Sequence, residues 1–324
     1  MQYFGVTEVE LNPQNISVVV PVYNSHQTLE NLVQRLIQVL PTMSPEYEII
    51  LVNDGSLDQS WREIEKISVS HHCVHGINLM RNYGQHNALL AGLRAARHEI
   101  VVTMDDDLQN PPEEIHKLIR ELEKGYDVVY GTPTVQAQSL WRNLASLVTR
   151  LALQSTMGIK HARNVSAFHA LRTHLRQAFD NYRSPYVILD VLLTWSTTRF
   201  SAVTVEHDPR KIGKSNYNLK KLILHAVNMI TGFTVLPLQF ASFLGFAFAL
   251  FGIIVLIYVV GRFLIQGGSV PGFPFLASII AIFSGVQLFA LGIIGEYLAR
   301  MHYRLMERPP YIILDETDSY QEIL

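Results

Sequence analysis

Two long stretches without a charged residue restrict the folds open to this chain more than any other feature. The first runs from Val227 to Gly261 and the second from Gln266 to Gly295. Each exceeds the roughly 20 residues that a helix needs to cross a bilayer. A buried pair of core helices is the alternative, but such a pair seldom stays uncharged over this length. The sequence therefore predicts two transmembrane helices, at about 236–264 and 274–299.

Basic residues flank the two stretches on their outer sides. They are Arg210, Lys211, Lys214, Lys220 and Lys221 before the first, and Arg300, Arg304 and Arg308 after the second. Only Arg262 lies near the connecting loop. Positively charged flanks stay in the cytoplasm, so we expect a hairpin in the plasma (inner) membrane with both termini and the remaining domain on the cytoplasmic side.

Bulk properties exclude some classes of protein. A net charge of −2 and a pI of about 6.7 give no support to a nucleic-acid partner. The first 14 residues have neither the charged start nor the apolar core of a signal peptide. The lone Cys73 excludes a disulfide within the chain and suits a reducing compartment.

Strand and helix patterns alternate over residues 16–131. Strands are expected at Ile16–Val20, Glu48–Val52, Val74–Leu79, Glu99–Met104 and Asp127–Tyr130. Helices are expected at Thr28–Leu40, Asp58–Ser68, Asn87–Ala96 and Pro112–Lys124. This alternation predicts an α/β fold whose mostly parallel sheet carries helices on both faces.

The chain continues with further expected elements. Helices are expected at Ser139–Met157 and Tyr186–Thr197, and a strand at Phe200–Glu206. The segment Asn218–Thr231 alternates basic and apolar residues, which is typical of a helix lying on a membrane surface.

Polar turns follow three of the expected strands. They read PVYN at Pro21–Asn24, NDGS at Asn53–Ser56 and MDDDLQ at Met104–Gln109. Ligands of such sheets bind beyond the carboxyl ends of the strands. We therefore expect the three turns to lie along one edge and to form the site.

Three adjacent aspartates stand out in the third turn. In an extended strand end, Asp105 and Asp107 point the same way, Gln109 adds an oxygen on that side, and Asp106 points towards backbone or solvent. One or two carboxylates together with substrate phosphates hold a hard cation such as Mg²⁺ or Mn²⁺. The alternative is a solvated acidic turn whose aspartates cap backbone amides.

Other polar residues are candidates for binding a substrate. Asp54 can accept hydrogen bonds from a nucleobase or ribose, although an Asx turn explains this residue on its own equally simply. Arg210 and Lys214 can bind a phosphate with Gly213 allowing close approach, and the alternative is positive charge at a membrane flank. Arg81, in RNYGQ, is a further phosphate candidate.

The ordered set PVYN, NDGS, RNYGQ, MDDDLQNPPEE and R-x-x-G-x-S-x-Y (Arg210–Tyr217) resembles the polyprenyl-phosphate glycosyltransferases. These are family 2 glycosyltransferases of the GT-A fold, and the resemblance is greatest to the group of bactoprenol glucosyltransferases and undecaprenyl-phosphate aminoarabinose transferases. It covers nearly the whole chain, including two C-terminal membrane helices and a tail similar to ERPPYIIL (Glu307–Leu314).

The resemblance implies a division of the chain and a set of roles. The catalytic domain would be 1–217, a juxtamembrane helix 218–233, the hairpin 234–300, and a tail with a short strand 301–324. The donor would be contacted by Pro21, Tyr23, Asp54, Asp106 and Arg81, and the metal (Mg²⁺ or Mn²⁺) by Asp105, Asp107 and Gln109. The lipid phosphate would be bound by Arg210, Lys214, Ser215 and Tyr217, with Asp105, Asp107 and Arg210 as the catalytic set.

The same resemblance implies a reaction and partners. The enzyme would transfer a sugar with inversion from a nucleoside diphosphate sugar, UDP being favoured, to polyprenyl (undecaprenyl) phosphate. It would form a homo-oligomer, often a tetramer, in which the tail strand pairs with a neighbouring subunit. An acceptor that is already anionic needs no general base, which agrees with a chain that shows no convincing nucleophile–base pair.

Three departures from the family pattern surround the expected donor pocket. Ser25 stands where a glutamate is common, TPTVQAQ (Thr132–Gln138) lacks a common arginine, and RNVSAFHALR (Arg163–Arg172) lacks the usual acidic start. They leave open a membrane-anchored binding or scaffold protein with a decayed transferase domain. A processive polysaccharide synthase is less favoured, because QSLWR at Gln138–Arg142 has the wrong order for its Q-x-x-R-W motif and only two membrane helices are present.

Overall fold

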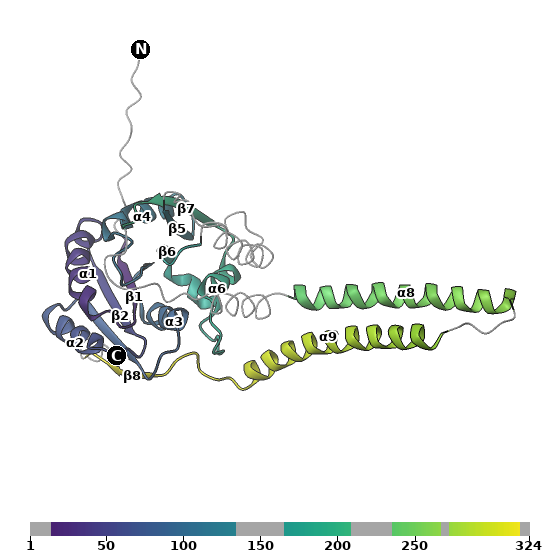
Figure 1. Cartoon of the computed structure of the whole chain (residues 1–324). Helices are drawn as coiled ribbons and strands as arrows, with labels where there is room; N and C mark the ends of the chain where they lie inside the picture. The colour runs from purple at the N-terminus through teal and green to yellow at the C-terminus, as the bar shows by residue number, and fades with distance from the viewer. Residues whose placement is uncertain (1–13, 134–164, 209–234, 267–271, 318–324) are drawn as a thin grey trace, which may run out of the picture. The chain divides into compact units, whose positions relative to one another are not determined.

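The computed structural model describes residues 14–133, 165–208, 235–266 and 272–317 of the 324-residue chain (Figure 1). The chain divides into two compact units. One consists of Met1–Leu140, Met157–Asn216 and Pro309–Leu324 and contains the sheet. The other consists of Trp141–Thr156 and Tyr217–Arg308 and contains the two long apolar helices.

The described part of the first unit contains an eight-stranded sheet in the order β7-β5-β6-β4-β1-β2-β3-β8. The strands are β1 (Ile16–Val22), β2 (Tyr47–Asn53), β3 (Val74–Leu79), β4 (Ile100–Thr103), β5 (Val128–Pro133), β6 (His169–Arg172), β7 (Phe200–Val205) and β8 (Ile313–Glu316). Strands β4, β1, β2 and β3 are parallel, as are β5 and β7, whereas β6 and β8 run antiparallel to their neighbours. The expected mostly parallel α/β sheet is confirmed.

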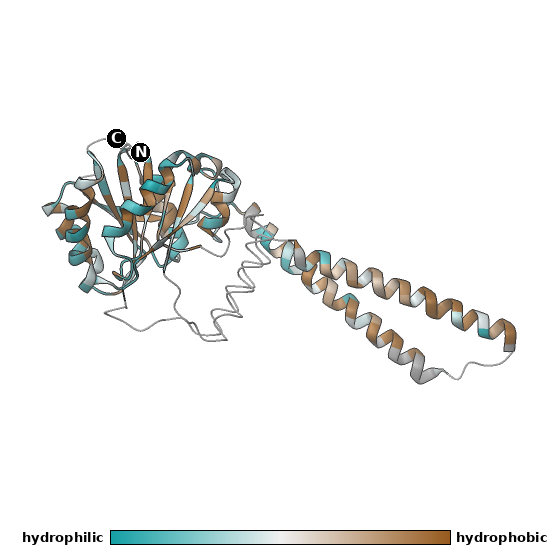
Figure 2. Cartoon of the chain, turned by 90° about the horizontal axis from the view of Figure 1, so that it is seen from above, coloured by the Kyte–Doolittle hydropathy of each residue, from teal (hydrophilic) through white to brown (hydrophobic). Residues whose placement is uncertain are grey.

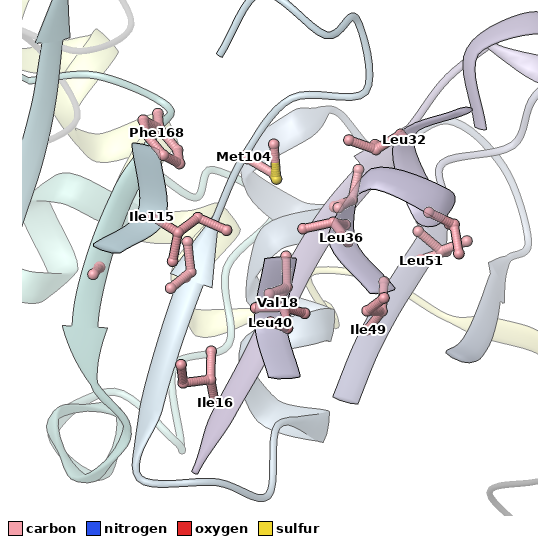
Figure 3. Packing of buried hydrophobic residues seen from close by; sticks show 14 of the residues in the cluster. Ile16, Val18, Leu32, Leu36, Leu40, Ile49, Leu51, Met104, Ile115 and Phe168 are labelled. Carbon is pink, nitrogen blue, oxygen red and sulfur yellow. The ribbon is translucent and has the colours of Figure 1, made fainter. Parts of the chain in front are cut away.

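Helices cover both faces of this sheet. The helices are α1 (His26–Val39), α2 (Ser60–Ser70) and α4 (Ile115–Glu123) on one face, and α3 (Gln85–Ala95) and α6 (Leu189–Ser196) on the other. Side chains alternate along a strand, so Val18 of β1 packs with Leu36 of α1 while the next residue, Val19, packs with the α3 side. Figure 3 shows the first of these clusters, with Leu32 and Leu36 of α1 gathered over β1 and β2.

One short 3₁₀ turn lies where an expected helix was too long. The helix expected from Pro112 begins as the turn η2 (Pro112–Glu114), and α4 starts only at Ile115. Two further 3₁₀ segments are η1 (Leu40–Thr42) and η4 (Thr173–Ala178). The segments Ser139–Met157 and Asn218–Thr231, both expected to be helical, lie outside the described residues.

The second unit contains two helices long enough to cross a membrane. They are α8 (Leu236–Gln266) and α9 (Phe273–Leu305), and their apolar windows span Pro237–Ile265 and Ile282–His302. The helices lie side by side, with the rings of Phe248 and Phe283 5.8 Å apart. Figure 2 shows apolar residues along the length of both helices. Apart from the buried Ala241 of α8, the described side chains of the two spans are at least partly exposed. Exposed apolar surface on all sides is what a lipid environment allows and water does not.

The tail that follows α9 returns to the sheet. Strand β8 pairs antiparallel with β3, and the N–H of Met80 donates to the carbonyl of Ile312 at 2.9 Å. The tail strand implied by the resemblance is therefore present, but its partner is the edge strand of its own chain. This pairing satisfies backbone groups of β3 that a free edge would expose. The tetramer remains a prediction.

Candidate functional site

The three polar turns lie together at one edge of the sheet because the strands that precede them are parallel neighbours. The N–H of Tyr23 donates to Asp106 Oδ2 at 3.2 Å. The N–H of Asn24 donates to Ser56 Oγ at 3.0 Å, and Asn24 Oδ1 accepts from the N–H of Leu57 at 2.8 Å. The turns after β1, β2 and β4 thus form one hydrogen-bonded rim, as expected from the sequence.

The acidic turn is not the extended strand end that we expected. Strand β4 stops at Thr103, and the three aspartates lie in a turn that leads to Leu108, whose φ is 60°. The alternation of side chains along a strand therefore does not determine where the three aspartate side chains point. Asp105 Oδ1 accepts a hydrogen bond from Gln85 Nε2 at 2.6 Å, and Asp107 Oδ1 accepts one from the N–H of Gln109 at 3.1 Å.

Asp106 differs from its two neighbours because its carboxyl group is turned inward. Burial raises the pKa of this carboxyl to about 6, and the charge of Asp107 acts in the same direction. Hydrogen bonds from the Ser25 hydroxyl and the Tyr23 N–H lower the pKa and limit the rise. Asp106 therefore links the rim internally. The sequence pattern pointed it towards backbone or solvent, and the donor contact that the resemblance implied for it stays a prediction.

The donor groups of the acidic turn suit one class of metal ion. Over the part of the chain that the structure describes, no three His, Cys, Asp or Glu side chains are grouped to hold a metal. That excludes, among those residues, a structural zinc site with four protein ligands. A pair of carboxylates, Asp105 and Asp107, fits a hard cation that takes its other ligands from phosphates and water, as Mg²⁺ and Mn²⁺ do.

Gln109 follows this pair and is fixed to the turn through its backbone. Its N–H donates to Asp107, and its carbonyl accepts from the N–H of Asp208 at 2.8 Å. Asp208 is the last described residue before the basic segment. Arg210, Lys214, Ser215 and Tyr217, the expected phosphate-binding residues, lie outside the described residues.

Asp54 has a role that the sequence did not indicate. It is 3% exposed, and its Oδ1 and Oδ2 accept the N–H groups of Tyr83 at 2.7 Å and Gly84 at 2.9 Å. Burial raises the pKa of its carboxyl, and these two hydrogen bonds oppose the rise. Asp54 therefore binds the loop that enters α3. From the sequence we expected Asp54 either to form a turn joining β2 to the helix that follows it or to contact the donor.

The other expected donor contacts are divided between the rim and the core. Tyr23 is 42% exposed at the rim. The guanidinium of Arg81 lies 4.6 Å from the centre of the Tyr83 ring. Pro21 is buried within β1, paired with Val52 of β2, and so belongs to the sheet.

Sequence reasoning missed two residues of the rim. Gln85, the first residue of α3, reaches Asp105, which is 20 positions further along the chain. Its place directly after Gly84 in RNYGQ was the only local sign of it. Ser25, noted as a departure, has its hydroxyl within hydrogen-bonding reach of two acceptors, the carbonyl of Tyr23 at 3.2 Å and the carboxyl group of Asp106. Of the Arg163–Arg172 departure, the last four residues, His169–Arg172, form β6 between β4 and β5.

Comparison with known sequences agrees with this architecture. The family described as glycosyl transferase family 2 matches residues 17–183. A Shewanella sediminis protein named undecaprenyl-phosphate 4-deoxy-4-formamido-L-arabinose transferase is 36% identical over 93% of this chain and 92% of its own. Proteins of the same name from Serratia proteamaculans (34%, 93% of both chains) and Yersinia pestis (33%, 96% of this chain and 97% of its own) are similar over nearly their full lengths.

Comparison with solved structures supports the fold of the first unit. Glucosyl-3-phosphoglycerate synthase of Mycobacterium tuberculosis matches with a TM-score of 0.50 at 20% identity, over 67% of this chain and 78% of that chain. A structure of that synthase with Mn²⁺, UDP and glucosyl-3-phosphoglycerate matches with the same TM-score at 19% identity, again over 67% of this chain and 78% of that one. At these identities the likeness extends to the GT-A sheet and its helices alone.

Proposed function

The chain belongs to glycosyl transferase family 2, and on that premise we propose that it transfers a sugar from a nucleoside diphosphate sugar to polyprenyl phosphate. The product would be a polyprenyl-phosphate-linked monosaccharide. One observation carries the proposal: a single chain combines a transferase sheet, whose rim presents Asp105 and Asp107, with two helices long enough to cross a membrane. The names of its relatives, which refer to undecaprenyl phosphate, support the same acceptor.

The rim is the proposed donor site. Asp105, Asp107 and Gln109 would hold Mg²⁺ or Mn²⁺, while Tyr23, Arg81 and the buried Asp54 would shape the nucleotide pocket. A divalent cation there would neutralise negative charge that builds up on the departing diphosphate. The chain's own residues keep the two carboxylates oriented, and UDP is the proposed nucleotide.

The acceptor would approach from the side of the basic segment. Its phosphate oxygen is already anionic at neutral pH, so no side chain has to remove a proton before it attacks the anomeric carbon. Arg210, Lys214, Ser215 and Tyr217 would bind that phosphate and reduce its repulsion from the donor. The anchoring of Asp208 on Gln109 supports this arrangement, because the chain enters the basic segment beside the acidic turn.

The same reasoning leads to a proposed location. The two apolar helices, together with relatives named for undecaprenyl phosphate, support a location in the inner membrane. We propose that the catalytic domain and both termini face the cytoplasm, where nucleotide sugars are made, because the basic residues flank the helices on their outer sides.

The decisive variant is Asp107→Asn. It removes the charge while keeping the size, and we expect transfer of radiolabelled sugar to undecaprenyl phosphate to fall by about a hundredfold or more, the order seen when one group that stabilises developing charge is removed. Asp180→Asn, at an exposed aspartate outside the rim, is the matched control and should keep full activity. Unchanged turnover in Asp107→Asn would refute the proposed role of the acidic turn.

The identity of the sugar needs a separate experiment. The purified full-length protein would be offered a panel of nucleotide sugars with undecaprenyl phosphate, and the lipid products would be identified by mass. A product carrying one sugar is expected. A polymer would indicate a processive synthase, and the absence of any product across the panel would favour the scaffold alternative.

A further inference from the structure

The loop Arg81–Gln85 is bound to the turn after β2 by its backbone. Both carboxyl oxygens of Asp54 are engaged by this loop, Oδ1 by the N–H of Tyr83 and Oδ2 by the N–H of Gly84. Asn87 holds the loop from the helix side, because its Nδ2 donates to the carbonyl of Tyr83 at 2.5 Å. Two charge-assisted hydrogen bonds to one buried carboxylate are a strong restraint on two consecutive peptide groups.

Gly55 brings the same loop even closer to the turn. Its φ is +63°, and a Cβ added there would lie 2.4 Å from both the carbonyl carbon of Arg81 and the amide nitrogen of Asn82. Real Cβ atoms do not approach backbone that closely, so any side chain at this position must push the loop away. The contact between the β2 turn and the loop therefore requires glycine at 55.

Gln85 connects this restrained loop to the acidic turn. It follows Gly84 directly and begins α3, and its Nε2 donates to Asp105 Oδ1 at 2.6 Å. A neutral amide donor orients a carboxylate and leaves its negative charge in place, whereas an arginine or lysine would neutralise that charge. The path from Asp54 to Asp105 thus runs through one short backbone segment and one side chain.

We propose that Asp54 and Gln85 are positioning residues that orient Asp105 for a divalent cation, with the Arg81–Gln85 loop transmitting the restraint. This inference rests on the proposed function of the acidic turn and adds a positioning role to the place of Asp54 in the proposed nucleotide pocket. Residues that orient metal ligands typically contribute about 10–100-fold to metal affinity.

The test measures metal binding and nucleotide binding separately in the full-length protein in detergent micelles. Mn²⁺ affinity in the presence of UDP is measured by electron paramagnetic resonance, and UDP affinity without metal, in EDTA, by calorimetry. The variants are Gln85→Ala, Asp54→Asn and Gly55→Ala. Gly125→Ala is the control for Gly55→Ala, because Gly125 also has a positive φ (+98°) but has nothing within 4 Å of an added Cβ.

We expect Gln85→Ala, Asp54→Asn and Gly55→Ala each to weaken Mn²⁺ binding by about tenfold. In Gln85→Ala, UDP affinity without metal should stay within twofold of wild type, and Asp54→Asn combined with Gln85→Ala should lose no more Mn²⁺ affinity than the larger single effect. Gly125→Ala should bind Mn²⁺ normally. Gln85→Ala and Gly55→Ala decide the matter even if the buried Asp54 variant folds poorly.

Three results would overturn the inference: normal Mn²⁺ affinity in Gln85→Ala, a Gly55→Ala protein that matches Gly125→Ala in Mn²⁺ affinity, or a Gln85→Ala protein that loses metal-free UDP binding. Asp107→Asn separates this failure from failure of the proposed function. If Asp107→Asn loses Mn²⁺ while Gln85→Ala does not, only the positioning role is wrong. If Asp107→Asn itself binds Mn²⁺ normally, the metal site proposed at the acidic turn is wrong.

Discussion

Glu48 offers a sharp test of what stabilises the sheet at the end opposite the site. It is 3% exposed near the start of β2, and its Oε1 accepts the hydroxyl of Ser17 at 2.6 Å and the N–H of Arg97 at 2.8 Å. Ser17 Oγ in turn accepts the N–H of His98 at 3.2 Å. This network joins β1 and β2 to the connection between α3 and β4, and Glu48→Ala removes its centre.

The expected cost follows from these contacts. Hydrogen bonds to a charged group contribute about 1.5–3 kcal/mol each, and a buried donor left without an acceptor costs about 1–3 kcal/mol. Ser17 is fully buried, whereas Arg97 is exposed and its N–H can recover some solvation. We therefore expect Glu48→Ala to destabilise the domain by about 3 kcal/mol, and Glu48→Gln, which keeps one acceptor oxygen, by about 1 kcal/mol.

The assay is thermal unfolding of the full-length protein in detergent, followed by intrinsic fluorescence. At about 2–4 °C per kcal/mol for a domain of this size, Glu48→Ala should lower the Tm by about 6–12 °C and Glu48→Gln by about 2–4 °C. Removing the donor as well, in Ser17→Ala with Glu48→Ala, should cost less than the sum of the two single variants. Because the network lies away from the rim, Mn²⁺ affinity should not change.

The reasoning fails if Glu48→Ala melts within about 2 °C of wild type, since the network would then contribute little. It fails equally if the Ser17 and Glu48 effects are simply additive, because two groups that share a hydrogen bond must be coupled.

The remaining predictions concern pH, a second buried carboxyl group and the tail. Burial lowers the pKa of His75 below its ordinary value of 6.5, so the unfolded chain binds a proton more readily than the folded chain does. The free energy of unfolding is therefore unaffected by His75 above pH 6.5 and decreases as the pH falls below it. The Tm should therefore drop between pH 7.5 and 5.5, and His75→Gln should reduce that drop. Tyr130→Phe removes the hydroxyl that donates to buried Asp190 at 3.0 Å, and should cost about 1–3 kcal/mol, seen as a lower Tm; an unchanged Tm would contradict it. A chain ending at Arg308 lacks β8 and exposes the edge of β3, so it should aggregate on size-exclusion chromatography, whereas a monodisperse truncated protein would disprove the capping role.

The local pattern of the sequence was enough to predict the sheet and the membrane helices. Short β-branched runs predict the strands, and successive side chains of a strand point to opposite faces, as Val18 and Val19 of β1 do. The uncharged stretches predict α8 and α9 within a few residues of their ends at the loop side. The rim was also predictable, because parallel strands that are neighbours must bring their carboxyl ends together. Each of these features depends on residues that are close in the chain.

Only the tertiary structure decided which polar groups meet at that rim. It placed the Gln85 amide on Asp105, directed Asp54 to the backbone of Tyr83 and Gly84, and paired β8 with β3. A sequence pattern records which side of a strand or helix is buried, but hydrogen-bond partners far apart in the chain depend on how all the elements pack at once. For that reason the acidic turn could be recognised from its residues, while the loop that we propose orients it could not.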